Sequence, residues 1–155
     1  MKENFRLAVI AGVVLILAVS CDPARKYEKE EEEKIQAYLN NNPELDYIEK
    51  ASGLFYCDTI VGTGDQVLAG DSVYFDYILA YLDGWEIADT CYASKVGVGL
   101  LIPGVDEALL YMKNGGWSKI VVPSYLGYGN TGIYFPAWTP LLYDLNITKL
   151  VHNKK

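Results

Sequence analysis

The sequence lacks most of the side chains that metal-dependent and nucleophilic catalysis require. It has one histidine, His152 in the C-terminal tail, and three cysteines, none of them in a Cys-x-x-Cys spacing. Zinc sites use closely spaced cysteine and histidine ligands, and Ser-His or Cys-His systems need a histidine beside the nucleophile. These two kinds of site are therefore excluded, and we expect neither a metal nor a cofactor.

Basic residues are also scarce. The chain has 13 lysines and arginines against 20 aspartates and glutamates, which gives a net charge of −7. Nucleic-acid binding needs a basic face, so we exclude nucleic acid as a partner. Aromatic residues are abundant instead. The 13 tyrosines and three tryptophans are residue types that often build apolar pockets with polar rims.

The N-terminal segment carries a targeting pattern. Lys2 and Arg6 precede an uncharged apolar run, Leu7 to Val19, which is shorter than the ~20 residues of a membrane-spanning helix. The run ends in Ala-Val-Ser-Cys at Cys21, which resembles the signal of bacterial lipoproteins. We predict a lipoprotein signal peptide at residues 1–20 and a lipid on Cys21 that anchors the protein to the cell envelope, outside the cytoplasm. The alternatives are an ordinary secretory signal and an uncleaved helix.

Residues 21–51 are interpreted as the lipidated cysteine followed by an acidic tether and helix. The like-charge block Glu30 to Glu33 is typical of a solvated surface. Three apolar residues follow at helical spacing: Ile35, Tyr38 and Leu39. We predict an exposed helix from Lys26 to Leu39, whose apolar stripe is too narrow for a core helix. A spacer is favoured, and self-association through this helix is the alternative.

Residues 52–155 have the pattern of one α+β domain. The expected strands are Gly53 to Ile60, Ser72 to Leu82, Trp85 to Asp89, Trp117 to Val122 and Thr139 to Leu150. The Asp83-Gly84 pair is typical of a hairpin turn. A short helix is expected from Val105, with one apolar face formed by Ala108, Leu109 and Met112. We predict a curved antiparallel β-sheet wrapped around one short α-helix, with a pocket at one end.

An ordered set of short motifs resembles the FKBP-type peptidyl-prolyl isomerases. The motifs are Gly70 to Phe75, Asp83-Gly84, Leu101-Ile102-Pro103-Gly104, Gly115-Gly116, Pro123, Tyr128-Gly129, Phe135-Pro136 and Leu141 to Leu145. They follow the family's order from about Ser52 to Leu150. The resemblance implies an enzyme that acts on X–Pro segments of exported or unfolded proteins and assists their folding.

The resemblance also implies the site residues. The catalytic positions are Asp89, Tyr128 and Ile102, and the substrate-binding positions are Phe75, Leu101, Val105, Phe135 and Tyr143. Rotation about a peptide bond faces a barrier of about 18–20 kcal/mol from the resonance of its C–N bond. An apolar cavity with a few donors lowers that barrier without a nucleophile, so the scarcity of catalytic side chains fits this class.

The sequence departs from the family pattern at three places. Val105 replaces the usual tryptophan of the pocket floor, which predicts a wider cavity. Ile87-Ala88 replaces the aromatic residue before Asp89, and Phe75 lacks the hydroxyl of the usual tyrosine. Four aromatic residues are candidates to refill the space: Trp85, Tyr92, Tyr134 and Trp138. The alternative functions are a non-catalytic binding or chaperone lipoprotein and a small-molecule-binding lipoprotein.

The two cysteines beyond Cys21 are Cys57 and Cys91. An oxidising compartment would permit a bridge between them. In the fold that the chain resembles, the strand of Cys57 lies at the far sheet edge from the loop that carries Cys91. We therefore predict that they are not bridged.

Overall fold

The computed structural model describes residues 23–84 and 86–153 of the chain, and the side chains of 24–84 and 92–153. The predicted signal peptide, the predicted lipid site Cys21 and the Trp85 side chain lie outside the described residues. Within the described ranges, no helix is both long and apolar enough to cross a membrane.

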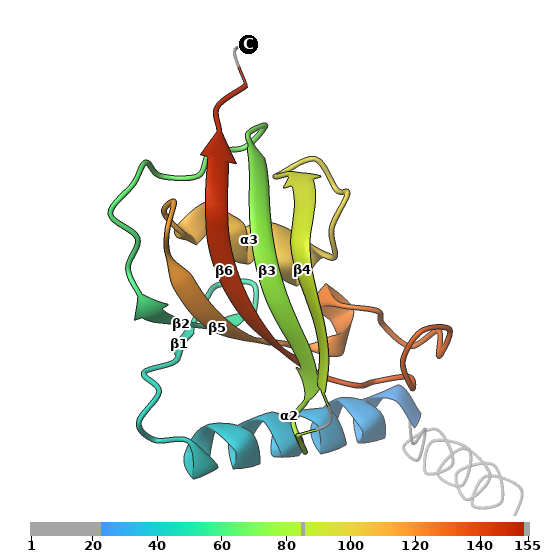
Figure 1. Cartoon of the computed structure of the whole chain (residues 1–155). Coiled ribbons are helices and arrows are strands. Elements are labelled where there is room, and N and C mark those ends of the chain that lie inside the picture. The colour runs from blue at the N-terminus through green and yellow to red at the C-terminus, as the bar shows by residue number, and fades with distance from the viewer. Residues whose placement is uncertain (1–22, 85, 154–155) are drawn as a thin grey trace, which may run out of the picture.

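A six-stranded antiparallel sheet, in the order β1-β2-β5-β6-β3-β4, forms the body of the molecule. Its strands are β1 (Ile48–Glu49), β2 (Phe55–Ile60), β3 (Ser72–Tyr81), β4 (Glu86–Lys95), β5 (Trp117–Val122) and β6 (Leu141–Val151). The sheet is strongly curved, and the helix α3 (Pro103–Tyr111) crosses its concave side (Figure 1). The predicted fold class, a curved antiparallel sheet wrapped around a short helix, is confirmed.

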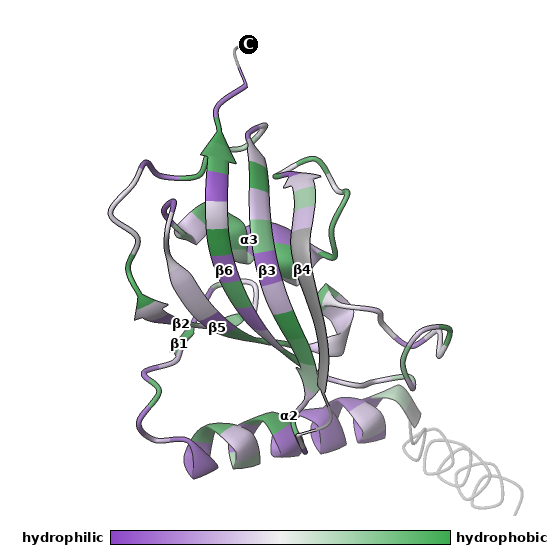
Figure 2. Cartoon of the chain, in the orientation of Figure 1, coloured by the Kyte–Doolittle hydropathy of each residue, from purple (hydrophilic) through white to green (hydrophobic). Residues whose placement is uncertain are grey.

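The core lies between α3 and the concave face of the sheet. Val105, Ala108 and Leu109 are buried on one face of α3, as their helical spacing predicts. The hydrophobic segments of β3 and β6 alternate with polar ones in Figure 2, because successive strand residues point to opposite faces. Gly104 brings α3 close to the sheet: a Cβ atom there would lie 2.6 Å from Val122 Cγ1. The Pro-Gly pair therefore starts the helix and permits its close packing.

The helix α2 (Pro23–Asn41) is not the exposed spacer that the sequence predicts. It packs across the convex side of the sheet at one end, where Ile35 is only 1% exposed and forms a second core with Phe55 and Val121. These two strand residues face each other in the register of β2 and β5. Their neighbours Tyr56 and Ile120 point into the main core, so both faces of the sheet are apolar here. The narrow stripe of α2 is sufficient to cover this patch.

The other side of α2 is solvated, and Figure 2 shows the helix as largely hydrophilic. Lys26 and Glu30, like Lys29 and Glu33, form exposed ion pairs one turn apart. Such exposed pairs contribute little stability. Docking of α2 therefore rests on its buried face.

The edges of the sheet differ from the predicted boundaries. β1 pairs with β2 through Ile48 and Glu49, so the sheet begins before the predicted domain boundary at residue 52. β4 continues to Lys95, beyond the predicted end at Asp89, because it pairs with β3 as far as Ser72.

Cys91 therefore lies in β4 and not in the predicted loop. Cys57 lies in β2, four strand positions away. Three strands, β5, β6 and β3, lie between β2 and β4, so the two backbones are farther apart than the Cα separation that a disulfide spans. The prediction that these cysteines are not bridged is confirmed, and Cys57 is a free, buried thiol.

Candidate active site

A cavity of about 500 Å³ opens at one end of the concave face. It is bounded by the strands β3, β4 and β6, by the first turn of α3 with the residues before it, and by the loop that joins β5 to β6. Its lining is apolar and aromatic: Phe75, Tyr77, Tyr92, Leu100, Leu101, Ile102, Val105, Tyr128, Tyr134, Phe135 and Tyr143. This volume is within the range of small-molecule and peptide side-chain sites.

The floor of the cavity is formed by buried residues of three elements. Val105 lies in the first turn of α3, Phe75 on β3 and Tyr143 on β6. All three are less than one tenth exposed. Because strand side chains alternate between the two faces of the sheet, Phe75 and Tyr77, two residues apart on β3, both point to the inner face. The two rings are 6.1 Å apart, and Tyr77 lies 6.0 Å from Tyr143.

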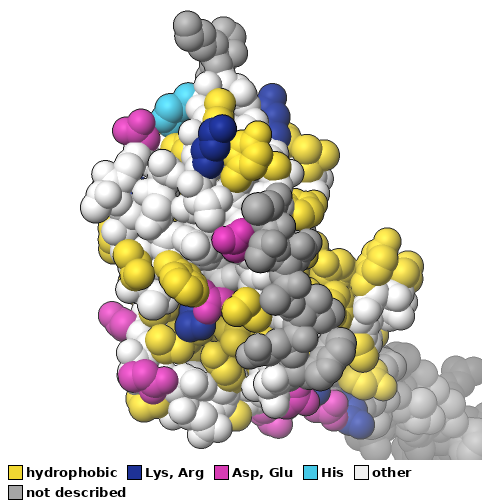
Figure 3. Space-filling view, in the orientation of Figure 1, with side chains coloured by type: hydrophobic (Ala, Val, Ile, Leu, Met, Phe, Trp, Pro, Cys, Tyr) yellow, Lys and Arg dark blue, Asp and Glu magenta, His cyan; other side chains and the backbone are white. Residues whose placement is uncertain are grey.

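The wall opposite α3 comes from the loop between β5 and β6. The ring of Tyr128 lies 4.8 Å from that of Phe135 and 5.7 Å from that of Tyr134. Phe135 also meets Tyr81 of β3 edge-on. Tyr134 and its neighbour Ile133 are 77% and 74% exposed, and Figure 3 shows hydrophobic side chains projecting from this part of the molecule. The cavity thus has a buried floor and an exposed hydrophobic rim.

The backbone before α3 supplies a donor at the cavity. The carbonyl of Ile102 begins the helix by accepting hydrogen bonds from the N–H groups of Val105 and Asp106. No described residue accepts a hydrogen bond from the Ile102 N–H. Asp106 in turn accepts hydrogen bonds from Gly97 and Gly99, at 2.7 and 3.3 Å, and so fixes the segment that leads to Leu101. The donor therefore belongs to a well-anchored helix start.

The cavity contains no charged side chain among the described residues that line it. Burial raises the pKa of Tyr143 far above its ordinary value, and its electrostatic interaction with Tyr128 raises it further. The Tyr143 hydroxyl is therefore neutral near pH 7. The chemistry available here is desolvation by apolar surface combined with neutral hydrogen-bond donors.

Seven of the eight predicted pocket residues are brought together at this cavity. They are Ile102, Tyr128, Phe75, Leu101, Val105, Phe135 and Tyr143. The eighth, Asp89, lies in β4 with its backbone opposite Tyr77, and its side chain is outside the described residues. The catalytic and binding roles of these residues stay predictions.

Sequence reasoning missed Tyr77 and Leu100. The signal for Tyr77 was its position two residues after Phe75, which places both on one face of β3. Tyr77 places a ring with a hydroxyl group beside Phe75, whose ring has no hydroxyl. Of the residues expected to refill the space, Tyr92 and Tyr134 line the cavity, whereas Trp138 stacks on Tyr27 of α2 instead.

The single histidine lies elsewhere. His152 is hydrogen-bonded to Asp71, at 2.9 Å, and to Asp65, at 3.4 Å, where it holds the end of β6 to the turn before β3. Within residues 23–84 and 86–153, no group of three histidine, cysteine, aspartate or glutamate side chains is placed to hold a metal ion.

The fold and the cavity together define a class of protein in which a half-wrapped sheet holds an apolar, aromatic pocket on its concave face. The sequence model of one family, described as FKBP-type peptidyl-prolyl cis-trans isomerase, matches residues 64–148, which is more than half of the chain. The chain belongs to this family.

Comparison with individual proteins gives relatives of two kinds. The chain is 31% identical over 128 residues to the photosynthetic NDH subunit of lumenal location 4 of Arabidopsis thaliana, and 28% identical over 132 residues to the FKBP-type isomerase FkpA of Buchnera aphidicola. These matches cover 70% and 79% of the chain, but only 58% and 52% of the relatives. The crystal structure of FkpA from Escherichia coli superposes with a TM-score of 0.68, at 22% identity, over 97% of this chain and 73% of that one.

Proposed function

We propose that the protein is a peptidyl-prolyl cis-trans isomerase that acts on X–Pro segments of exported or unfolded proteins. The observation that carries this proposal is the neutral aromatic cavity, with the Ile102 N–H and the Tyr128 side chain beside its floor. Isomerisation breaks no covalent bond, so it needs neither a nucleophile nor a metal.

The cavity acts on the prolyl amide through its polarity. A planar amide is stabilised by a charge-separated resonance form, which water favours and an apolar cavity disfavours. Phe75, Val105 and Tyr143 form the surface on which the prolyl ring rests. Leu101 and Phe135 flank the residue that precedes the proline. Removing the amide from water therefore lowers the barrier to rotation.

Two donors hold the twisted amide. The Ile102 N–H and the Tyr128 hydroxyl donate to substrate carbonyls, and binding that is tighter in the twisted state than in the planar states accelerates rotation. In this mechanism Tyr143, whose raised pKa keeps it neutral, donates to the Tyr128 oxygen. The proton of Tyr128 is then free to point at the substrate. The family resemblance assigns a catalytic role to Asp89, and we include it in the proposed site. Its backbone pairs with that of Tyr77, a cavity residue.

The test is the cis-to-trans rate of proline tetrapeptides that differ in the residue before proline, measured with the chain from Asp22 onward. Acceleration is expected, and Tyr128→Phe should lower kcat/KM by about threefold to tenfold, the effect of one lost hydrogen bond. Asp89→Ala should lower it as well. No acceleration by folded protein would refute the proposal.

A second candidate is a non-catalytic binding or chaperone protein. Two observations favour it: the exposed rim at Ile133 and Tyr134, and a relative whose name describes an NDH subunit and not an isomerase. This candidate predicts that the protein suppresses aggregation of an unfolded protein without accelerating proline isomerisation. Paired substitutions Ile133→Ser and Tyr134→Ser would then remove the suppression.

We also propose that the protein is exported and anchored to the bacterial cell envelope by a lipid on Cys21. The pattern of residues 1–21 supports this proposal. Radiolabelled palmitate incorporation that is lost in Cys21→Ala tests it. Self-association through α2 is not part of the proposal, because the stripe that a dimer needs already packs on the sheet of its own chain.

A further inference from the structure

The helix α2 contacts both ends of the loop that carries the cavity tyrosines. This loop, residues 123–140, joins β5 to β6 and is called the pocket loop below. It contributes Tyr128, Tyr134 and Phe135 to the cavity. Its two ends are held by different side chains of α2, which is nearly a hundred residues earlier in the chain.

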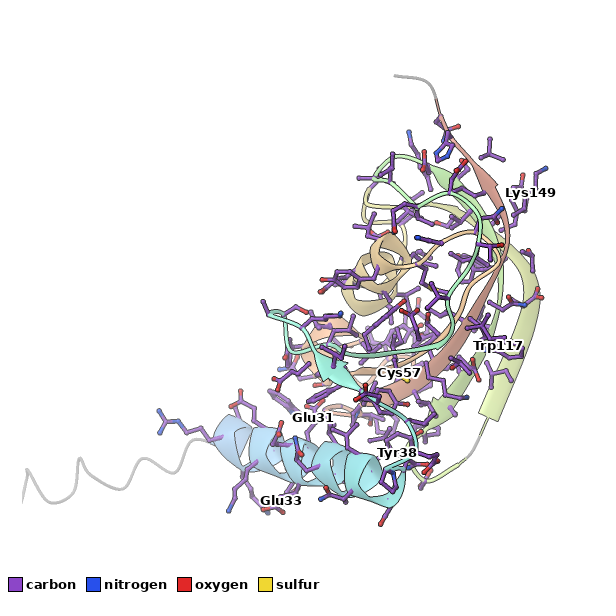
Figure 4. All side chains as sticks on the ribbon, turned by 90° about the vertical axis from the view of Figure 1, so that its left-hand side faces the viewer. Glu31, Glu33, Tyr38, Cys57, Trp117 and Lys149 are labelled. Carbon is purple, nitrogen blue, oxygen red and sulfur yellow. The ribbon has the colours of Figure 1, made fainter. Side chains whose placement is uncertain are left out.

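The first end is held by a buried carboxylate. Glu31 accepts hydrogen bonds from the Ser124 N–H, at 2.5 Å, and from the Ser124 hydroxyl, at 2.7 Å, one on each of its oxygens. Glu31 is 5% exposed and Ser124 is 1% exposed. Buried carboxylates are found where such donors satisfy them, and hydrogen bonds to a charged oxygen are stronger than neutral ones. Figure 4 shows Glu31 on the side of α2 that faces the domain.

Ser124 in turn is hydrogen-bonded to the backbone on both sides of Tyr128. The Ser124 carbonyl accepts hydrogen bonds from the N–H groups of Gly127, at 2.9 Å, and Gly129, at 2.8 Å. These two glycines flank Tyr128 in the sequence. The position of Ser124 therefore fixes the backbone on both sides of the tyrosine that we propose as a donor.

The other end of the pocket loop is held through Trp138. Its N–H donates to the Gly129 carbonyl, at 3.2 Å, and its ring stacks on that of Tyr27 of α2, with 6.3 Å between centroids and 9° between planes. Trp138 has φ of 60°, a left-handed conformation that bulky residues adopt only where their surroundings hold them. Gly129 is therefore hydrogen-bonded both to Ser124, which Glu31 holds, and to Trp138, which Tyr27 holds.

Packing alone does not account for Glu31. Ile35, one turn further along α2, already supplies apolar contact with Phe55 and Val121. A carboxylate buried beside this cluster costs desolvation energy that an apolar residue would avoid. The contribution of Glu31 is that its two hydrogen bonds hold Ser124 in one position.

We propose that Glu31 is a positioning residue of the active site, and that α2 orders the pocket loop through Ser124 so that Tyr128 is set for catalysis. The effect on rate rests on the proposed isomerase function. The effect on loop order does not, because the hydrogen bonds of Gly127 and Gly129 exist independently of any substrate.

The experiment compares Glu31→Ala with Glu33→Ala in the chain from Asp22 onward. Glu33 lies on the same helix, its side chain is 66% exposed, and it points away from the domain in Figure 4. Hydrogen exchange by NMR is followed at the Gly127 and Gly129 amides and at the amides of β3 and β6. Proline isomerisation is measured on the same samples.

In Glu31→Ala, the Gly127 and Gly129 amides should exchange about tenfold faster, the effect of one lost hydrogen bond, while β3 and β6 amides keep their rates. The isomerase kcat should fall by a similar factor with little change in KM, because Tyr128 acts on the twisted amide. Glu33→Ala should change neither. Glu31→Gln should keep part of the wild-type amide protection and of the wild-type kcat, because its amide oxygen still accepts a hydrogen bond from the Ser124 N–H.

The inference is overturned if Glu31→Ala exchanges like Glu33→Ala, or if it accelerates exchange uniformly across the domain. Faster exchange confined to the pocket loop, in a protein with no isomerase activity, would retain the positioning role and refute the proposed enzyme. If Glu31→Ala does not fold, Ser124→Ala removes only the hydroxyl contact. It should shift both readouts in the same direction to a smaller extent, and an unchanged loop would refute the inference.

Discussion

The side chain of Tyr143, buried on β6, interacts with that of Tyr128 on the pocket loop, and this interaction raises the pKa of Tyr143 beyond the effect of burial. The two residues come from different elements and meet where the cavity floor joins its wall. Because burial keeps Tyr143 neutral, this contact orients Tyr128 without introducing a charge into the cavity.

This contact predicts that Tyr143→Phe lowers isomerisation even though its ring stays in place. We expect kcat/KM to fall about threefold to tenfold, since the proposed hydrogen bond from Tyr143 to Tyr128 is lost. The double variant with Tyr128→Phe should be no slower than Tyr128→Phe alone, because the two hydroxyls act as a unit. Fully additive losses would show that Tyr143 acts independently of Tyr128.

The second prediction concerns the cavity floor. Val105→Trp should be accommodated in the cavity of about 500 Å³ and lower Tm by no more than a few degrees. Isomerisation should rise, because a flat ring contacts more of the prolyl group. The control Val73→Trp places the same ring in the closed core, where overpacking should cost about 1–3 kcal/mol or more. Equal destabilisation of both variants would mean that the space at Val105 is not available.

The third prediction tests whether α2 is part of the folded unit. Ile35→Ala should lower the free energy of unfolding by about 2–5 kcal/mol, as expected for a buried isoleucine. Ile48→Ala, at an exposed position of β1, should change it by less than about 0.5 kcal/mol. Urea unfolding at one pH measures both. A spacer helix would give a small effect for both variants.

The fourth prediction concerns pH. The hydrogen bond with Asp71 raises the pKa of His152 above its ordinary value of 6.5. Stability from this contact is therefore fully present below pH 6.5 and is lost as the pH rises through the raised pKa. Tm should fall over this interval in the wild type, and His152→Gln should remove that part of the pH dependence. An identical fall in the variant would assign it to other groups.

Asp71 titrates in the opposite sense at acid pH. Burial raises its pKa, but hydrogen bonds from the Leu68 N–H and from His152 outweigh burial, so the pKa of Asp71 is lowered overall. Its contribution is present above the ordinary pKa of an aspartate and is lost as the pH falls through the lowered value. The Asp71→Asn variant should therefore lose less stability than the wild type in acid.

Local sequence signals were sufficient for the elements that have clear boundaries. β5 has the predicted bounds, Trp117 to Val122, because a glycine pair precedes it and Pro123 ends it. The cavity residues could be predicted from the order of the family motifs, although the order alone missed Tyr77. β4 was predicted too short because its length depends on pairing with β3, which its own residues do not encode.

The position of α2 could not be predicted from its own pattern. Its stripe of three apolar residues is equally compatible with a spacer, and the block of glutamates predicts exposure. The deciding features are Phe55 and Val121, which point to the convex side of strands whose other residues fill the main core. Glu31 is buried only because Ser124 offers two donors at that place.

The docking of α2 also has a consequence for how the proposed lipid holds the domain. Only Asp22 separates Cys21 from the start of α2 in the sequence, and α2 is fixed to the sheet and to the pocket loop. Two residues span at most about 7 Å. A lipid on Cys21 would therefore keep this end of α2 beside the bilayer, and client chains would meet the cavity close to the membrane surface.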